Sequence, residues 1–235
     1  MASVKAPRQR RAQRAEATRR RIVEEAGRLF AADGYQATTI EAVAQAADVS
    51  VETIYKRFGT KQALLRATLN LLIIDEPQPR SFAGEFLTLP ALQAVRAEPD
   101  QAVQLRMLAA FSRATLERSA SIHRMVRSAG AGGELAEFTT ISHTTRRRSQ
   151  RALIDLLMIN GPLRLDADAA GETYAALANP DVYLLLIDEH GWTPQGYETW
   201  LADTLTRLLL PDPHPRPPRE ADADQARPQH PRPQK

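Results

Sequence analysis

The 235-residue chain contains no cysteine. Disulfide bonds, thiolate nucleophiles and cysteine-ligated zinc are therefore excluded together. No apolar run approaches the roughly 18 residues needed to cross a bilayer, and no apolar stretch follows the basic N-terminus as it would in a secretory signal. These absences predict a cytoplasmic protein with no membrane partner.

The common catalytic motifs are also missing. The chain has no Walker loop, no GxSxG and no HExxH. Its five histidines lie in no metal-ligand spacing, and they are His123, His143, His190, His214 and His230. Ordinary surface or core histidines explain this pattern best. We therefore expect no enzymatic activity, no cofactor and no metal site.

The net charge of +3 is distributed unevenly. Residues 1–21 contain eight basic residues and one acidic residue, whereas residues 22–210 carry a net charge of −5. A cationic arm on an acidic body indicates a polyanionic partner at one end of the molecule. A solubilising disordered segment explains the same charges, so charge alone leaves both interpretations open.

Apolar periodicity predicts an all-α fold class. Apolar residues recur at helical spacing from Ile22 to Phe30, and Gly34 lies where a left-handed residue would end that helix. Thr38 with Glu41 forms a capping-box pattern for a second helix, and Ser50 can cap a third that ends at Gly59. A fourth helix begins near Thr60, and no segment here alternates with the period of a strand.

The rest of the chain is less regular. The stretch "DEPQPRSFAGEFLTLP" is typical of a connector, and helices are expected from Asp100 to Ala114, around Ile122 to Val126, from about Glu134 to Ile159, and from Thr193 onward. The last third of the long helix is apolar nearly all round, so a second surface must cover it. From Pro211 onward the chain contains eight of its 16 prolines, and we expect a disordered tail.

Two short helices joined by "AADVS" suit a helix-turn-helix, in which the second helix enters the major groove. Ile54 and Phe58 are four residues apart and can both face the first helix. The remaining side carries groups that can bind phosphate oxygens, namely Ser50, Thr53, Tyr55 and Lys56, and Lys61 adds a further cation in the first turn of the fourth helix. A merely solvated polar face has the same spacing, so this pattern alone does not separate the two interpretations.

Residues 18–65 resemble the N-terminal DNA-binding domain of the tetracycline-repressor (TetR/AcrR) family. The resemblance is carried by "LFAADGYQATTI", "VAQAADVSVETIYKRF" and "TKQALL", in the order and spacing typical of that family. It implies an N-terminal helix-turn-helix domain followed by a larger helical ligand-binding and dimerisation domain. We accordingly expect a disordered basic arm (1–17), a DNA-binding domain (18–66), a ligand-binding and dimerisation domain (67–210) and a Pro-rich tail (211–235).

The resemblance also implies roles for single residues. A residue matching Thr38 or Thr39 caps the second helix at a phosphate. The basic arm, which includes Arg14, resembles the N-terminal arms whose arginines enter the minor groove. The other implied contacts are Ser50, Val51, Glu52 and Thr53 near bases, and Tyr55, Lys56 and Lys61 at the backbone. Asp48 stands where family members usually have glycine, and Glu52 where they often have a small residue.

Adaptable and aromatic side chains on separate helices are typical of mostly apolar ligand pockets. The expected pocket residues are Met107, Phe111, Met125, Phe138, His143 and Arg147, with His123 as a further polar anchor. The apolar end of the long helix and the last helix are the expected four-helix dimer interface. Its residues are Leu153, Leu157, Trp200, Leu201, Leu205 and Leu208. For each of these residues taken alone, an ordinary position in the hydrophobic core is the alternative to a role in the pocket or the dimer interface.

These observations predict a ligand-responsive transcriptional regulator, most simply a repressor. It is expected to bind a palindromic double-stranded DNA operator as a homodimer and to be released by a small, mostly apolar effector. A helical enzyme or lipid-binding protein with an appended helix-turn-helix is the alternative from another class. A third interpretation is an architectural protein that uses its basic arm without sequence preference. The run "TRRRSQR" is either a second nucleic-acid patch or a set of ion pairs to the acidic body.

Overall fold

The computed structural model describes residues 5–74, 86–129 and 135–212. Within these ranges the regular structure is helical and includes no β-strand, which confirms the all-α class. Across the same ranges, every helix is too short or too polar to span a bilayer. The expected tail lies almost wholly outside the described residues, which end at Asp212.

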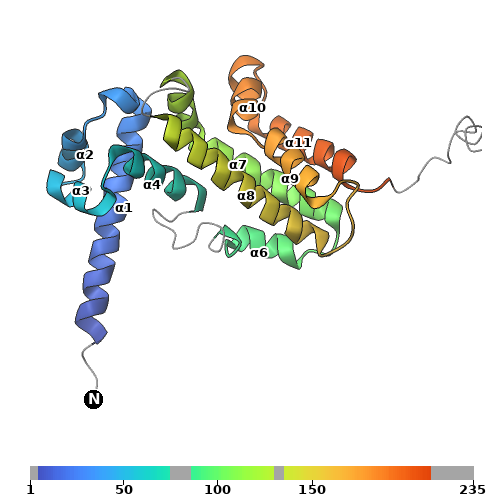
Figure 1. The fold of residues 1–235 in the computed structure, drawn as a ribbon, viewed down its shortest axis with the longest axis horizontal. Helices are drawn as coiled ribbons and strands as arrows, with labels where there is room; N and C mark the ends of the chain where they lie inside the picture. Colours follow the sequence, from blue (N-terminus) through green and yellow to red (C-terminus); the bar gives the residue numbers. More distant parts are fainter. Residues whose placement is uncertain (1–4, 75–85, 130–134, 213–235) are drawn as a thin grey trace, which may run out of the picture.

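The N-terminal unit consists of α1 (Lys5–Ala37), α2 (Ile40–Ala46), α3 (Val51–Phe58) and α4 (Lys61–Ile74). Gly34 interrupts α1 with φ 83° and ψ 167°, at the position where the sequence predicts an end. Thr39 caps α2, Ser50 caps α3, and Gly59 follows α3 at positive φ. Figure 1 shows α2 and α3 side by side along α1.

The prediction of a disordered arm is contradicted where the structure describes it, because α1 already begins at Lys5. Its early turns consist mainly of alanine, arginine, glutamine and glutamate, which are strong helix formers. The only proline, Pro7, lies in the first turn, where a missing amide hydrogen costs little. These turns project beyond the rest of the fold (Figure 1), so the arm is a basic helix rather than a loose chain.

The larger domain follows a different plan from the expected one. Its elements are α6 (Pro90–Ala97), α7 (Gln101–Ala129), α8 (Ala136–Met158), α9 (Ala167–Leu177), α10 (Pro180–Leu184), the π-helical turn η2 (Leu185–Glu189) and α11 (Pro194–Leu209). One helix, α7, replaces the two that the pattern predicts, because no glycine or proline interrupts the chain before its end. The apolar pattern does not predict α6, α9 and α10, which are short and, in α9, rich in alanine.

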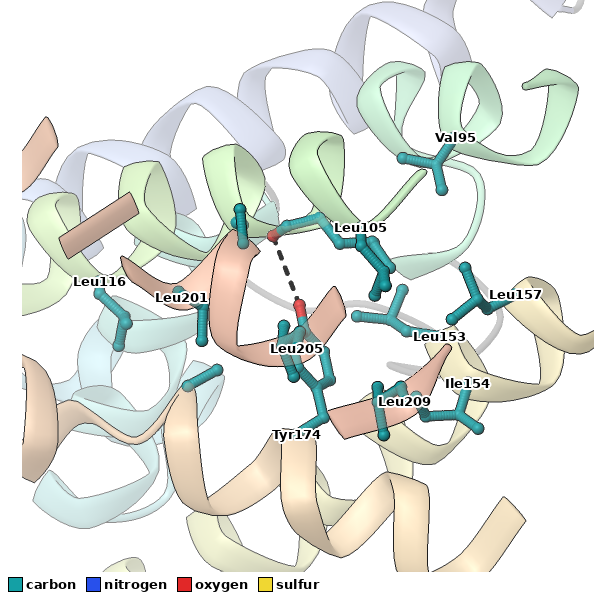
Figure 2. Packing of buried hydrophobic residues seen from close by; sticks show 14 of the residues in the cluster. Val95, Leu105, Leu116, Leu153, Ile154, Leu157, Tyr174, Leu201, Leu205 and Leu209 are labelled. Atoms are coloured by element: carbon teal, nitrogen blue, oxygen red, sulfur yellow. Dashed lines mark hydrogen bonds between the residues drawn. The ribbon is translucent and has the colours of Figure 1, made fainter. Parts of the chain in front are cut away.

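Two hydrophobic cores divide the molecule. One gathers apolar residues of α7, α8, α9 and α11, several of which are labelled in Figure 2. The other joins α1 to α4 with the end of α7 and the start of α8, including Ile122 and Phe138. The expected boundary at residue 66 falls inside α4, whose Leu64 and Leu69 both belong to the second core. The helix α4 therefore ties the N-terminal unit to the larger domain.

Candidate DNA-binding surface and ligand cavity

Helix α3 presents one apolar and one polar side. Ile54 is buried in the core, and the guanidinium of Arg19 lies 4.4 Å from the centre of the Phe58 ring, which anchors that side to α1. On the other side the Tyr55 side chain is 50% exposed, and Glu52 and Lys56 are exposed as well. The structure thus gives α3 the outward polar face that its sequence pattern allowed.

The beginning of α3 is held by a pair of hydroxyl groups. The Ser50 Oγ accepts the amide hydrogen of Thr53 at 3.2 Å and lies 2.9 Å from the Thr53 Oγ1. One hydroxyl donates to the other, so the accepting hydroxyl keeps its own proton for an outside acceptor. Val51 packs against the N-terminal core, which leaves it only half-buried at the margin of the surface.

The two threonines before α2 have different environments. The Thr39 side chain is exposed, and its Oγ1 accepts the amide hydrogen of Ala42 at 3.0 Å. The Thr38 side chain is only 2% exposed, and its hydroxyl donates to the Gly34 carbonyl at 2.8 Å. A buried hydroxyl that is already bonded cannot reach a phosphate, so Thr38 is removed from the set of expected contacts.

Cationic side chains fasten α3 and its flanks. The Nη2 of Arg21 donates to the Asp48 carbonyl at 3.4 Å, and the Nη1 of Arg57 donates to the Ala15 carbonyl at 3.1 Å. Asp48 has φ 50°, in the left-handed region that the glycine of related sequences would occupy. Aspartate adopts this region more readily than most residues, which explains why the turn tolerates it.

Two further cations were expected to contact DNA. The Nζ of Lys61 lies 3.4 Å from the Gln36 carbonyl oxygen and 4.3 Å above the centre of the Tyr35 ring, so this ammonium is held against the end of α1. The Arg14 side chain is exposed on the projecting part of α1. Both residues stand on the N-terminal unit, as the sequence predicts.

A cavity of about 290 Å³ lies between α4, α7 and α8, with Phe86 and the α9–α10 segment also in its wall. Its apolar lining includes Leu69, Ile73, Phe86, Phe111, Leu116 and Leu153. Its polar lining includes Arg66, Asn70, Ser112, Thr115, Ser119, His123, Ser142, Thr145, Arg146, Ser149, Gln150 and Tyr174. The space has the mixed character of a small-molecule site.

The sequence carries a signal for this cavity that apolar periodicity does not reveal. Small hydroxyl residues recur on one face of α7, at Ser112, Thr115 and Ser119. A matching stripe on α8 consists of Ser142, Thr145 and Ser149. Each stripe follows the helical repeat, and side chains this small leave open space where two long helices face one another.

Burial changes the acid–base properties of the cavity wall. Burial, reinforced by the charge of Arg146, lowers the pKa of His123 to about 3, so this imidazole is neutral at physiological pH. Burial also lowers the pKa of Arg146, although the charge of Asp181 acts in the opposite direction. Burial raises the pKa of Tyr174 to about 12, and its hydroxyl lies 2.7 Å from the Ser112 Oγ.

The expected pocket set needs correction. Phe111 lines the cavity and so does His123, whereas the other expected residues are absent from the wall. Met125 and Phe138 are buried in the N-terminal core, and Met107 packs against the other core. His143 is exposed on α8. The side chain of Arg147 points to the surface, where its Nη2 lies 2.5 Å from the Glu172 Oε1.

The expected dimer set is corrected as well. Leu153, Leu157, Leu201 and Leu205 are buried within a single chain. The second surface that the apolar end of α8 requires is supplied by the same chain, as Figure 2 shows for Leu157 and Leu209. Of the six expected residues, Leu208 remains exposed at 44% and Trp200 is half-buried.

Two of the four arginines in the run of α8 form ion pairs with acidic side chains. Arg147 pairs with Glu172, while Arg151 pairs with Asp155 and with Asp168. Glu172 and Asp168 belong to α9, so these contacts fasten α9 to α8. This arrangement agrees with the ion-pair interpretation of "TRRRSQR" for Arg147 and Arg151.

Comparison with known proteins gives the same picture of the N-terminal unit. The model of the family described as bacterial regulatory proteins, tetR family, matches residues 22–68. The HTH-type transcriptional regulator YvkB of Bacillus subtilis, described as uncharacterized, is 42% identical over 53 residues. That match spans 23% of this chain and 28% of YvkB.

The fold of most of the chain is also found among solved structures. NalD of Pseudomonas aeruginosa, the secondary repressor of the MexAB-OprM multidrug efflux pump, has a TM-score of 0.58 and 22% identity, covering 84% of this chain and 98% of NalD. SmeT, solved in complex with triclosan, has a TM-score of 0.59 and 16% identity, covering 86% and 99%. At these identities the likeness concerns the fold alone. YvkB is described as a transcriptional regulator and NalD as a repressor, and neither description names an enzymatic activity.

Proposed function

We propose that the protein, whose residues 22–68 match the model of the tetR family of bacterial regulatory proteins, is a ligand-responsive repressor of transcription. In this proposal a homodimer binds a palindromic operator through α3. A small, mostly apolar effector enters the cavity between α4, α7 and α8 and releases the DNA. NalD, which shares the fold, is itself a repressor, and this supports the proposed sign of regulation.

The position of α4 is the observation that carries the proposal. Leu64 and Leu65 of this helix lie in the core that supports α2 and α3. Leu69, Asn70 and Ile73 of the same helix line the cavity. A ligand that moves α4 therefore moves an element packed against the DNA-binding unit. Couplings between two such sites are typically about 1 to 3 kcal/mol, or roughly fivefold to 150-fold in affinity.

The proposed DNA contacts are the exposed groups of the N-terminal unit. At the start of α3, Ser50, Glu52 and Thr53 are placed to approach base edges in the major groove. Tyr55 and Lys56 are placed to hold phosphates, and so is Thr39 at the start of α2, where helix amides also favour an anion. Arg14 on the projecting end of α1 extends the cationic surface, and Lys61 adds charge near the end of α1.

The proposed dimer interface is the exposed apolar side of η2 and α11. Leu185, Trp192 and Leu208 are exposed there, and the Trp192 and Trp200 rings meet edge to face with centroids 6.0 Å apart. Large apolar groups that are exposed together mark association surfaces. A two-fold dimer is expected to set its recognition helices about 34 to 36 Å apart, which matches two half-sites of a palindrome.

The effector is proposed to be small and largely apolar. Phe86, Phe111 and Leu153 form much of the wall of a space of only about 290 Å³. SmeT, which shares the fold, is solved in complex with triclosan, and this supports a small organic molecule as the ligand. The Tyr174 hydroxyl lies 2.7 Å from the Ser112 Oγ, a contact that joins α9 to α7 at the wall of the cavity.

Selection of bound sequences from fragmented genomic DNA tests this proposal. The purified full-length chain is expected to enrich fragments that share one palindrome, and the double variant Tyr55→Ala, Lys56→Ala is expected to lose that enrichment while keeping its melting temperature. A double variant of exposed α11 and α9 residues, Asp203→Ala with Glu172→Ala, is the control on the far domain. Enrichment no better than random duplex would refute the regulator and favour an architectural protein.

A further inference from the structure

We propose that the cavity between α4, α7 and α8 binds a small organic anion, with the negative charge held between Arg66 and Arg146 and the apolar body beside Phe86 and Phe111. The proposal rests on the proposed function, since the same cavity is assigned to the effector. It replaces the expectation of a merely apolar molecule with a specific chemical class: a monocarboxylate on a compact apolar frame.

The charge of the wall is the first argument. The cavity is lined by two arginines, one from α4 and one from α8, and by no aspartate or glutamate. Across the residues that the structure describes, neither guanidinium makes a hydrogen bond or an ion pair with the protein. Other arginines of α7 and α8 do have carboxylate partners, as Arg113 has Glu198 and Arg147 has Glu172. Within the cavity wall, both arginines are therefore left to bind an outside anion.

The cost of burying the charge of Arg146 is the second argument. Burial disfavours the charged form of Arg146 and lowers its pKa, and the charge of Asp181 offsets this only in part. A buried cation without a bonded partner is unfavourable, and a carboxylate brought by a ligand relieves that penalty through charge-assisted hydrogen bonds. The neutral His123 beside Arg146 adds an N–H donor and no competing charge.

Unpaired polar atoms supply the third argument. Among the described residues, five buried side-chain atoms have no hydrogen-bond partner, and three of them belong to this wall: the Nε of Arg66, the Oγ1 of Thr115 and the Oε1 of Gln150. These atoms face the protein rather than the open space, so small side-chain rotations are needed to reach a ligand. Unsatisfied polar groups are rare in native proteins and point to a missing partner.

The remaining wall fixes the apolar part of the ligand. The rings of Phe86 and Phe111 meet edge to face with centroids 5.7 Å apart, and Leu69, Ile73, Leu116 and Leu153 complete the surface. The volume of about 290 Å³ limits the body to a small frame, either a short alkyl chain or one or two fused rings. A cationic ligand would meet two guanidinium groups and no carboxylate, so like-charge repulsion selects against it.

Calorimetric titration of the full-length protein without DNA tests the proposal with matched probes. The anions are 2-naphthoate and octanoate, the neutral partners of the same shape are 2-naphthamide and octanamide, and the cation is octyltrimethylammonium. At least one carboxylate is expected to bind about tenfold or more tightly than its amide, because hydrogen bonds to a charged group are stronger than neutral ones. Comparing the ring with the chain identifies the shape of the frame.

Variants of single arginines show where the carboxylate of the ligand binds. Arg66→Gln and Arg146→Gln are each expected to remove most of the preference for carboxylate over amide, while Arg146→Lys retains part of it. Arg148→Gln is the matched control, since Arg148 lies on the same helix but is exposed and outside the wall. The preference of Arg148→Gln for carboxylate over amide should equal that of the parent protein. Melting curves of all four variants show whether a loss of binding reflects unfolding, and Arg146→Lys serves if a glutamine variant fails to fold.

Each result decides between the claims. Equal binding of acid and amide, tighter binding of the cation, no binding of any probe, or an equal loss in Arg148→Gln would overturn the anion proposal. The proposed function is judged separately, by operator binding: a regulator released by a neutral compound defeats only the anion claim. A carboxylate preference that disappears in the cavity variants, in a protein with no preferred DNA sequence, supports the anion site and defeats the regulator.

Discussion

The N-terminal unit and the cavity-bearing domain place their polar side chains in opposite directions. On α3, Glu52, Tyr55 and Lys56 are exposed while Ile54 is buried. On α7 and α8, hydroxyl residues and Arg146 line the cavity while Arg147 pairs at the surface. A short helix on the outside of a fold has one apolar side to bury, so its polar side is free. A long helix in the middle has several neighbours, and each of its sides is assigned by packing.

The substitution with the largest expected effect distinguishes a residue buried within one chain from a residue of the proposed dimer interface. Leu205 is buried within one chain, whereas Leu208 on the same helix is 44% exposed. Leu205→Glu is expected to cost more than about 4 kcal/mol of folding free energy, because it buries an unpaired charge in the core. Leu208→Glu should leave the melting temperature within a few degrees and convert dimer to monomer. Thermal melts with light scattering check both; a folded Leu205→Glu monomer would restore Leu205 to the interface.

The arm provides the next largest effect. Deletion of residues 1–14 removes Lys5, Arg8, Arg10, Arg11 and Arg14. The slope of log K against log salt is expected to become shallower by about 0.9 for each phosphate that the arm no longer neutralises, and by roughly 4.5 if all five charges bind phosphates. Binding at several salt concentrations measures this. An unchanged slope would show that the projecting part of α1 does not touch DNA.

The cavity predicts a pH effect on stability. The pKa of His123 is about 3 in the folded chain and 6.5 in an ordinary environment, so below pH 6.5 the unfolded chain takes up a proton that the folded chain does not. Stability should therefore fall as the pH drops from 6.5 toward 3, by up to about 1.4 kcal/mol per pH unit from this group. Denaturant unfolding at pH 7 and pH 5 should show a smaller loss in His123→Gln than in the parent.

The exposed His190 provides the control for that experiment. His190→Gln is expected to lose as much stability between pH 7 and pH 5 as the parent does. Equal losses in the parent and in His123→Gln would mean that water or a mobile side chain solvates this imidazole.

Two tyrosine substitutions, one in each region, have the smallest expected effects. Tyr55→Phe removes an exposed hydroxyl and is expected to weaken binding to all duplexes by about 1 kcal/mol without changing the melting temperature. Tyr174→Phe removes the partner of Ser112 in the interior and should cost about 1 to 2 kcal/mol of stability with operator affinity retained. Thr53→Ala should instead alter base preference. Identical behaviour of both tyrosine variants would contradict the division between the two regions.

Many helix ends are predictable from the sequence because the residues that determine them are local. Ser50 and Gly59 mark the two ends of α3, and Thr193 with Pro194 marks the start of α11, each within a few residues of the helix it bounds. The end of a helix depends on the backbone groups of its first and last turn, so nearby residues are sufficient. The wall of the cavity is not predictable in this way, since Arg66, Phe111 and Arg146 come from three helices and meet only when those helices pack.

The run of three arginines on α8 shows what local sequence determines and what depends on contacts with distant parts of the chain. Local sequence is enough to place Arg146, Arg147 and Arg148 on a helix, where successive residues point about 100° apart. Their surroundings depend on the packing of α4 and α7 on one side and of α9 on another. Arg146 faces the cavity, Arg147 pairs with Glu172 and Arg148 is exposed to solvent. Identical side chains thus acquire different roles, because their neighbours come from distant parts of the chain.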